Sequence, residues 1–214
     1  MKSTQFWNLI LLSLLFLSAC NQDNKDKVEA PESQTKKLFE PFRFHKAVEV
    51  KPGLTLDVVS WGRGSESVGA YLILRSDSSH LKYKSISGEL DGKIVDVWNM
   101  DMDADGNPEL FIQSKGEGEG SYLNMYVYEF NSSGSAQEIP FPNLSGKTKN
   151  GYKGGDSLYI KEDDLMREFP VINEDDTSKV KAPLEKKVLK YRLRGNSFSV
   201  EEVKEVVDEA KSQK

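Results

Sequence analysis

Short apolar segments with polar residues at alternate positions recur along most of the chain. The segments predicted as strands lie between turn-forming residues and span 54–61, 70–76, 81–90, 93–100, 109–114, 122–130, 157–160, 165–172, 187–195 and 197–203. Alternation with period two indicates a strand that turns one face to a core. Many short strands with turns between them are typical of antiparallel sandwiches and barrels. We therefore predict an all-β fold, an antiparallel β-sandwich, with a barrel-like arrangement as the alternative.

Three positions along this pattern add detail. Residues 122–130 alternate an aromatic face with a largely aliphatic face, which predicts a strand covered on both sides. The dipeptide Asp91-Gly92 stands between two predicted strands and is the strongest short signal for a β-hairpin. Beyond residue 203, valines and an alanine fall at helical spacing, which predicts a short C-terminal helical tail.

The N-terminus has the pattern of a bacterial export signal. Lys2 supplies a positive charge, residues 9–17 are apolar except for one serine, and the sequence LSAC ends at Cys20. The apolar run is too short to span a membrane in the mature protein. LSAC resembles the lipobox of bacterial lipoproteins, in which the cysteine receives acyl chains such as palmitate. We predict a signal peptide at residues 1–19 and lipidation of Cys20; an ordinary secretory signal with an incidental cysteine is the alternative.

The rest of the chain divides into a tether and a domain. Residues 21–37 are polar and charged, a composition that cannot offset the entropy of ordering, so Cys20 and this stretch form a predicted disordered tether at 20–37. Residues 38–214 suit a single β-sandwich domain. Asn21, where an aspartate would mark retention in the inner membrane, favours the outer membrane, facing the periplasm. The formal net charge of −5 argues against nucleic acid as a partner.

One acidic stretch has the spacing of a cation loop. It reads D-x-D-x-D-G-x-x-E and comprises Asp101, Asp103, Asp105, Gly106, Asn107 and Glu109. Carboxylates at positions 1, 3 and 5 can converge on one hard cation, with further oxygens from positions 7 and 9. The bidentate glutamate of an EF-hand is missing, since Ile112 occupies its place, and the pattern resembles the strand–loop–strand cation loops of integrin-type propeller repeats. Calcium binding and a tight turn capped by its own aspartates are both open.

The stretch SKGEGEGSY, residues 114–122, alternates glycine with glutamate and ends in a tyrosine. It is either a flexible hairpin connection or a loop that reaches a partner. Elsewhere, His45 and His80 are the only histidines, and neither has a serine motif or a metal-spaced partner near it. No set of residues forms a credible active site, so we predict that the protein is not an enzyme and requires no cofactor, with calcium as the one candidate.

Several short motifs in a fixed order resemble one known family. The segments DMDADGNPELFI, GSY, NGYKGGDSLYIKEDDLMREFPVI and KYRLRGNSF, together with SVGAYLILRSD upstream, are similar to the periplasmic inhibitors of invertebrate-type lysozyme. The resemblance covers most of residues 50–200. It implies an all-β protein that is secreted or lipid-anchored and is not enzymatic.

The resemblance also implies which residues bind the partner. The family's inhibitory loop is S-G-x-Y, and Gly120 and Tyr122 match it, while Ser121 fills the variable place and Glu119 stands where the family has serine. The implied function is a lipid-anchored cell-envelope protein that inhibits a lysozyme by inserting this glycine-rich loop into the active-site cleft. The alternative is a calcium-binding envelope adhesion module that uses the acidic loop.

Overall fold

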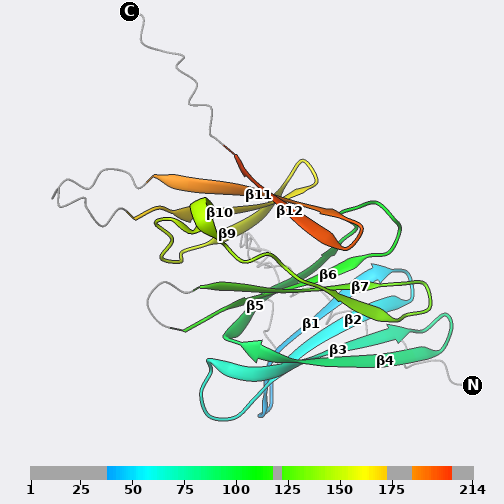
Figure 1. Cartoon of the computed structure of the whole chain (residues 1–214). Helices are drawn as coiled ribbons and strands as arrows, with labels where there is room; N and C mark the ends of the chain where they lie inside the picture. Colours follow the sequence, from blue (N-terminus) through cyan, green and yellow to red (C-terminus); the bar gives the residue numbers. More distant parts are fainter. Residues whose placement is uncertain (1–37, 118–121, 173–184, 204–214) are drawn as a thin grey trace, which may run out of the picture. The chain divides into compact units, whose positions relative to one another are not determined.

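The structure, a computed structural model, describes residues 38–117, 122–172 and 185–203 (Figure 1). The chain divides into two units, Met1–Lys37 and Leu38–Lys214. The predicted signal peptide, Cys20, the tether and the C-terminal tail all lie outside the described residues, as do Glu119, Gly120 and Ser121 of the predicted partner loop. The part of the chain that is described contains no helix with the length and apolarity needed to cross a membrane.

The described residues of the second unit are almost entirely β. The strands are β1 (Phe42–Lys51), β2 (Leu54–Trp61), β3 (Val68–Asp77), β4 (Lys82–Asp91), β5 (Lys93–Met100), β6 (Glu109–Lys115), β7 (Leu123–Phe130), β8 (Ala136–Ile139), β9 (Ser157–Lys161), β10 (Asp164–Pro170), β11 (Lys186–Arg194) and β12 (Ser197–Val203), with one short helix, α1 (Gly146–Lys149). They form three antiparallel sheets ordered β1-β2-β3-β4, β5-β6-β7-β8 and β12-β11-β10-β9. The prediction of an all-β antiparallel sandwich is confirmed, and none of the described sheets closes into a barrel.

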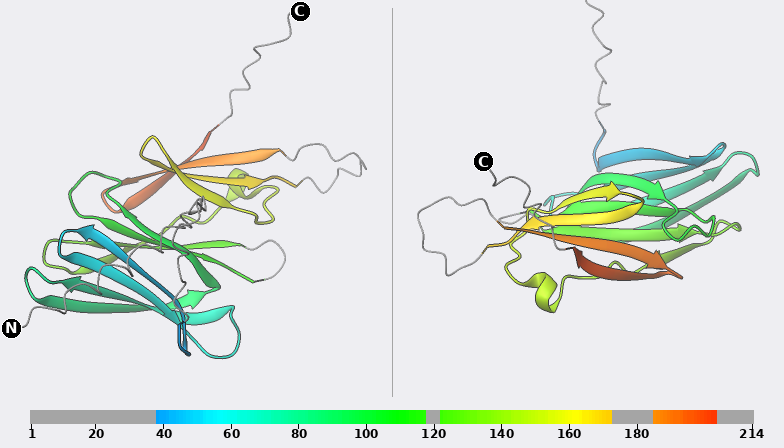
Figure 2. Two further views of the ribbon diagram at one scale, coloured as in Figure 1. Left: turned by 180° about the vertical axis from the view of Figure 1, so that it is seen from behind. Right: turned by 90° about the horizontal axis from the view of Figure 1, so that it is seen from above.

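The sheet β5–β8 is the middle layer and serves two cores (Figures 1 and 2). Along β6, Leu110 and Ile112 face the core shared with β1–β4, whereas Phe111 faces the core shared with β9–β12. On β7, Tyr128 and Val127 divide in the same way. A strand buried on both faces reads as a nearly continuous apolar run. The prediction that residues 122–130 are covered on both sides is therefore confirmed.

The predicted hairpin at Asp91-Gly92 is wrong. This turn joins β4 to β5, which belong to different sheets, so it is a corner between two layers. The backbone N–H of Asp91 donates to the Tyr126 hydroxyl at 2.8 Å, and the Ser114 hydroxyl donates to the Asp91 carbonyl at 2.6 Å. Gly92 supplies a φ of +79°, which an Asp-Gly turn provides whether or not the flanking strands pair. The hydrogen bonds of Asp91 to Tyr126 on β7 and Ser114 on β6 position the chain where it passes from β4 to β5.

Three elements were not predicted: β1, β8 and α1. β1 pairs only with β2, at the edge of its sheet, and Val48 is its one buried residue. The alternation is nevertheless present in the sequence, with Phe42, Phe44, Val48 and Val50 on one face, and only Lys46 and Ala47 interrupt it. The helix and β8 are each four residues long, too short for a periodic signal.

Candidate functional site

Tyr122 is the one residue of the predicted partner loop that the structure describes. It precedes β7, and its carbonyl accepts a 2.9 Å hydrogen bond from the N–H of Gly116 just after β6. Its side chain is 49% exposed. The phenol ring packs edge-on against the ring of Tyr152, with 5.5 Å between the ring centroids. Tyr122 is therefore both available to a partner and supported from one side.

A buried polar network holds the supporting ring. The Tyr152 hydroxyl donates to Asp156 at 2.5 Å and accepts from Arg167 at 3.0 Å, while Arg167 Nε donates to the other Asp156 oxygen at 2.6 Å. The side chains of Asp156 and Arg167 are 0% and 5% exposed. Burial and the bond to Asp156 raise the pKa of Tyr152 to about 12. Three mutually bonded groups from two segments therefore fix Tyr152 beneath Tyr122.

Sequence reasoning included none of these three residues among the site residues. All three lie in the segment NGYKGGDSLYIKEDDLMREFPVI that resembles the lysozyme inhibitors, but Asp156 and Arg167 are eleven positions apart and no spacing rule pairs them. The available signal is the position of Arg167 on β10, directly after the buried apolar residues Leu165 and Met166. A charged side chain at a buried position requires a partner of opposite charge, although the sequence alone does not name it.

The acidic loop between β5 and β6 brings its carboxylates together. One oxygen each from Asp101, Asp103, Asp105 and Glu109 lies within 4.8 Å of the others. The loop is also closed by its own side chains. The two Asp101 oxygens accept the N–H groups of Asp105 and Gly106 at 3.1 and 3.0 Å. The tight turn and the convergent carboxylates are thus present in one structure.

Asn107, the remaining candidate ligand, turns its side chain inward to the same loop. Its amide Nδ2 donates to Asp105 at 2.9 Å, and its backbone N–H donates to the other Asp105 oxygen at 2.7 Å. The amide therefore positions the Asp105 carboxylate.

Glu109 is the buried member of the acidic cluster. The residue is 0% exposed, and its Oε2 accepts the Met102 N–H at 2.7 Å. Its Oε1 has no hydrogen-bond partner among the described residues, and the same holds for a buried oxygen of Asp103. Burial, and then the charges of Asp103 and Asp101, raise the pKa of Glu109 to about 7.

Glu129 on β7 adds a fifth carboxylate that sequence reasoning did not identify. It is directly opposite Glu109 in the β6–β7 register and is 9% exposed. Burial raises its pKa, followed by the charges of Asp105, Asp103 and Asp101. The signal in the sequence was a glutamate on the aliphatic face of segment 122–130, where an apolar residue would fit the pattern.

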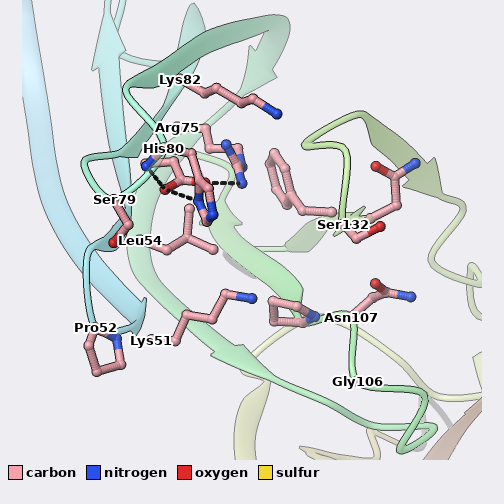
Figure 3. Close-up of a pocket in the computed structure, with 14 residues that line it drawn as sticks. Lys51, Pro52, Leu54, Arg75, Ser79, His80, Lys82, Gly106, Asn107 and Ser132 are labelled. Atoms are coloured by element: carbon pink, nitrogen blue, oxygen red, sulfur yellow. Dashed lines mark hydrogen bonds and ion pairs between the residues drawn. The ribbon is translucent and has the colours of Figure 1, made fainter.

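A pocket of about 350 Å³ with a positively charged lining opens beside the acidic loop (Figure 3). It is lined by Lys51, Pro52, Leu54, Arg75, Asp77, Ser79, His80, Lys82, Gly106, Asn107, Pro108, Phe130, Asn131 and Ser132. Arg75 is 5% exposed and donates to Asp77 at 3.2 Å. Asp77 also accepts from the His80 backbone at 3.1 Å. With Lys51 and Lys82 also in the lining, this pocket suits an anionic group and not a metal ion.

Comparisons with protein-family models, with curated proteins and with solved structures find no match to this chain.

Proposed function

We propose that the protein is a lipid-anchored inhibitor of a lysozyme in the bacterial cell envelope, and that the loop ending at Tyr122 enters the active-site cleft of the enzyme. The observation that carries the proposal is the setting of Tyr122, which is half-exposed at the end of the β6–β7 loop and packs on Tyr152. Aromatic side chains on a rigid support are the residues that most often dominate a protein interface.

The chemistry of the target fits a tyrosine. Lysozymes hydrolyse glycosides with two carboxyl groups in a cleft. The phenol of Tyr122 can fill a sugar-binding position and donate a hydrogen bond to a carboxylate. The acidic chain, with a net charge of −5, would accelerate its encounter with a basic lysozyme.

Glu119, which stands where the lysozyme-inhibitor family has serine, brings a negative charge to the loop. In a desolvated cleft its carboxylate would meet the enzyme's carboxylates, and like charges repel strongly there unless one is protonated. We therefore expect Glu119→Gln to inhibit more strongly than the unchanged protein at neutral pH. Weaker inhibition by Glu119→Gln would mean that the glutamate contributes a favourable contact.

The test is hydrolysis of bacterial cell walls by an invertebrate-type lysozyme, with the chain from residue 21 onward added as inhibitor. Tyr122→Ala should raise the inhibition constant by about 30-fold, the effect of losing one interface hot spot. Tyr159→Ala is the matched control, because Tyr159 is also a partly exposed tyrosine but is on β9. Absence of inhibition at micromolar protein would refute the function, and equal inhibition by Tyr122→Ala would refute the role of the loop.

The anchor has its own test. We expect the full chain, expressed in bacteria with labelled palmitate, to incorporate the label and to fractionate with the outer membrane. Cys20→Ala should abolish both. Label that persists in Cys20→Ala would overturn the lipoprotein proposal without affecting the inhibitor proposal.

A further inference from the structure

We propose that the β5–β6 loop binds one calcium ion between Asp101, Asp103, Asp105 and Glu109, and that this ion compensates the buried negative charge of Glu129 on the neighbouring strand. The inference is independent of the inhibitor function, because it rests on residues at the other end of β6. It assigns a structural metal site to the middle sheet.

The arrangement of the carboxylates matches the size of calcium. Calcium binds oxygen ligands at 2.3–2.6 Å, so two ligands on opposite sides of the ion are about 5 Å apart. The four candidate oxygens all lie within 4.8 Å of one another, close enough to surround one such ion with little movement. Magnesium demands shorter bonds in a strict octahedron and keeps most of its water, which suits a site of four protein carboxylates poorly.

The buried oxygen of Glu109 is the observation that separates this loop from an ordinary acidic turn. The side chain is fully buried, one oxygen is satisfied by the Met102 N–H, and Oε1 has no partner within the described ranges. A buried carboxylate oxygen without a partner destabilises the fold. Glu109 nevertheless directs an oxygen at the three aspartates, and the ionised carboxylates repel one another unless a cation stands between them.

Glu129, on the neighbouring strand β7, adds a further negative charge that a cation would offset. Like charges placed directly opposite each other on antiparallel strands are destabilising, and Glu109 and Glu129 form such a pair. The charged side chains that act on Glu129 are the loop aspartates, all of the same sign. Between the described residues, no ion pair with lysine, arginine or histidine involves any of the five carboxylates. A divalent cation supplies the missing positive charge.

The experiment is calcium binding by the chain from residue 21 onward after removal of metal with a chelator. Calorimetric titration should show one calcium per chain, with weaker binding of magnesium. Calcium at about 100 times its dissociation constant should raise the melting temperature by about 5–10 °C, because the ion binds only the folded state. Absence of saturable binding up to about 10 mM calcium, or an unchanged melting temperature, would overturn the proposal.

Three variants test the position of the ion. Asp105→Asn changes an exposed residue and should weaken calcium binding at least 10-fold without disturbing the core, whereas Glu89→Gln removes an exposed carboxylate of β4 and should leave binding unchanged. Glu129→Gln removes repulsion that the ion would otherwise offset, so it should reduce the calcium-induced rise in melting temperature. Unchanged binding by Asp105→Asn, or magnesium binding as tight as calcium binding, would refute the assignment.

Discussion

Replacing Asp156 by asparagine would leave the guanidinium of Arg167 buried without its counter-charge. The two side chains are 0% and 5% exposed and are joined by a 2.6 Å hydrogen bond from Arg167 Nε. Asparagine has nearly the shape of aspartate but keeps only one of the two oxygens that accept from Arg167 and Tyr152. The substitution therefore removes the charge and one acceptor of the network that supports Tyr152, with little change of volume.

The expected loss of stability is large because the pair is buried. Removal of one partner of a buried ion pair typically costs about 3–5 kcal/mol, whereas an exposed pair contributes about 0–1 kcal/mol. For a unit of this size, the larger figure corresponds to a fall in melting temperature on the order of 10 °C. Changing both partners, in Asp156→Asn with Arg167→Met, should recover part of the loss, since no uncompensated charge then stays in the core.

Urea unfolding followed by circular dichroism measures these differences. Asp57→Asn is the control, because Asp57 pairs with His45 on the surface at a similar distance of 2.7 Å. It should cost less than about 1 kcal/mol. If Asp156→Asn costs no more than this control, Arg167 is not held in the core by Asp156 and the account of Tyr152 is wrong.

Two further substitutions test a turn and an ion pair. Gly92→Ala should destabilise by more than about 2 kcal/mol, because φ is +79° and the added Cβ would lie 2.2 Å from the Lys115 carbonyl oxygen. Gly64→Ala, where φ is +85° with no atom within 4 Å, should cost clearly less in the same urea assay, and equal losses would contradict the packing argument. The hydrogen bond from Lys190 holds the pKa of Asp164 below its usual value of 3.8. The ionised Asp164 therefore stabilises the fold at pH values above 3.8, and this stabilisation is lost as the pH falls through the lowered pKa. The stability difference between the protein and Asp164→Asn should therefore shrink below pH 4 in acid unfolding curves, and a difference that stays constant to pH 2 would contradict this.

Most strands could be predicted from the sequence because they are short segments with alternating apolar and polar residues that lie between turn-forming residues. Residues 54–61, 93–100 and 197–203 coincide with β2, β5 and β12. Their grouping into three sheets could not be predicted in the same way. The turn at Asp91-Gly92 illustrates why: local chemistry specifies a positive φ, and whether the flanking strands pair depends on side chains from β6 and β7, which are distant in sequence.

The residues of the candidate sites also differ in whether the sequence alone could predict their contacts. The aspartates of the acidic loop are close in sequence, so their convergence follows from their spacing. Glu129 joins them through the register of β6 with β7, and Arg167 meets Asp156 through the packing around β10. No local pattern encodes these contacts, because each depends on how two separate segments are placed by the fold.

The two proposed sites occupy opposite ends of one strand, which makes them separable. Glu109 begins β6 and Lys115 ends it, next to the backbone bond between Gly116 and Tyr122. Six residue steps along a strand span about 20 Å, more than twice the distance of about 8 Å over which physiological salt screens exposed charges. An ion at Glu109 therefore has little direct electrostatic influence on a partner at Tyr122. Its influence on inhibition would pass through the folding equilibrium, so calcium should matter for inhibition only near the melting temperature of the calcium-free protein. A calcium dependence well below that temperature would instead mean that β6 transmits a change of geometry from one end to the other.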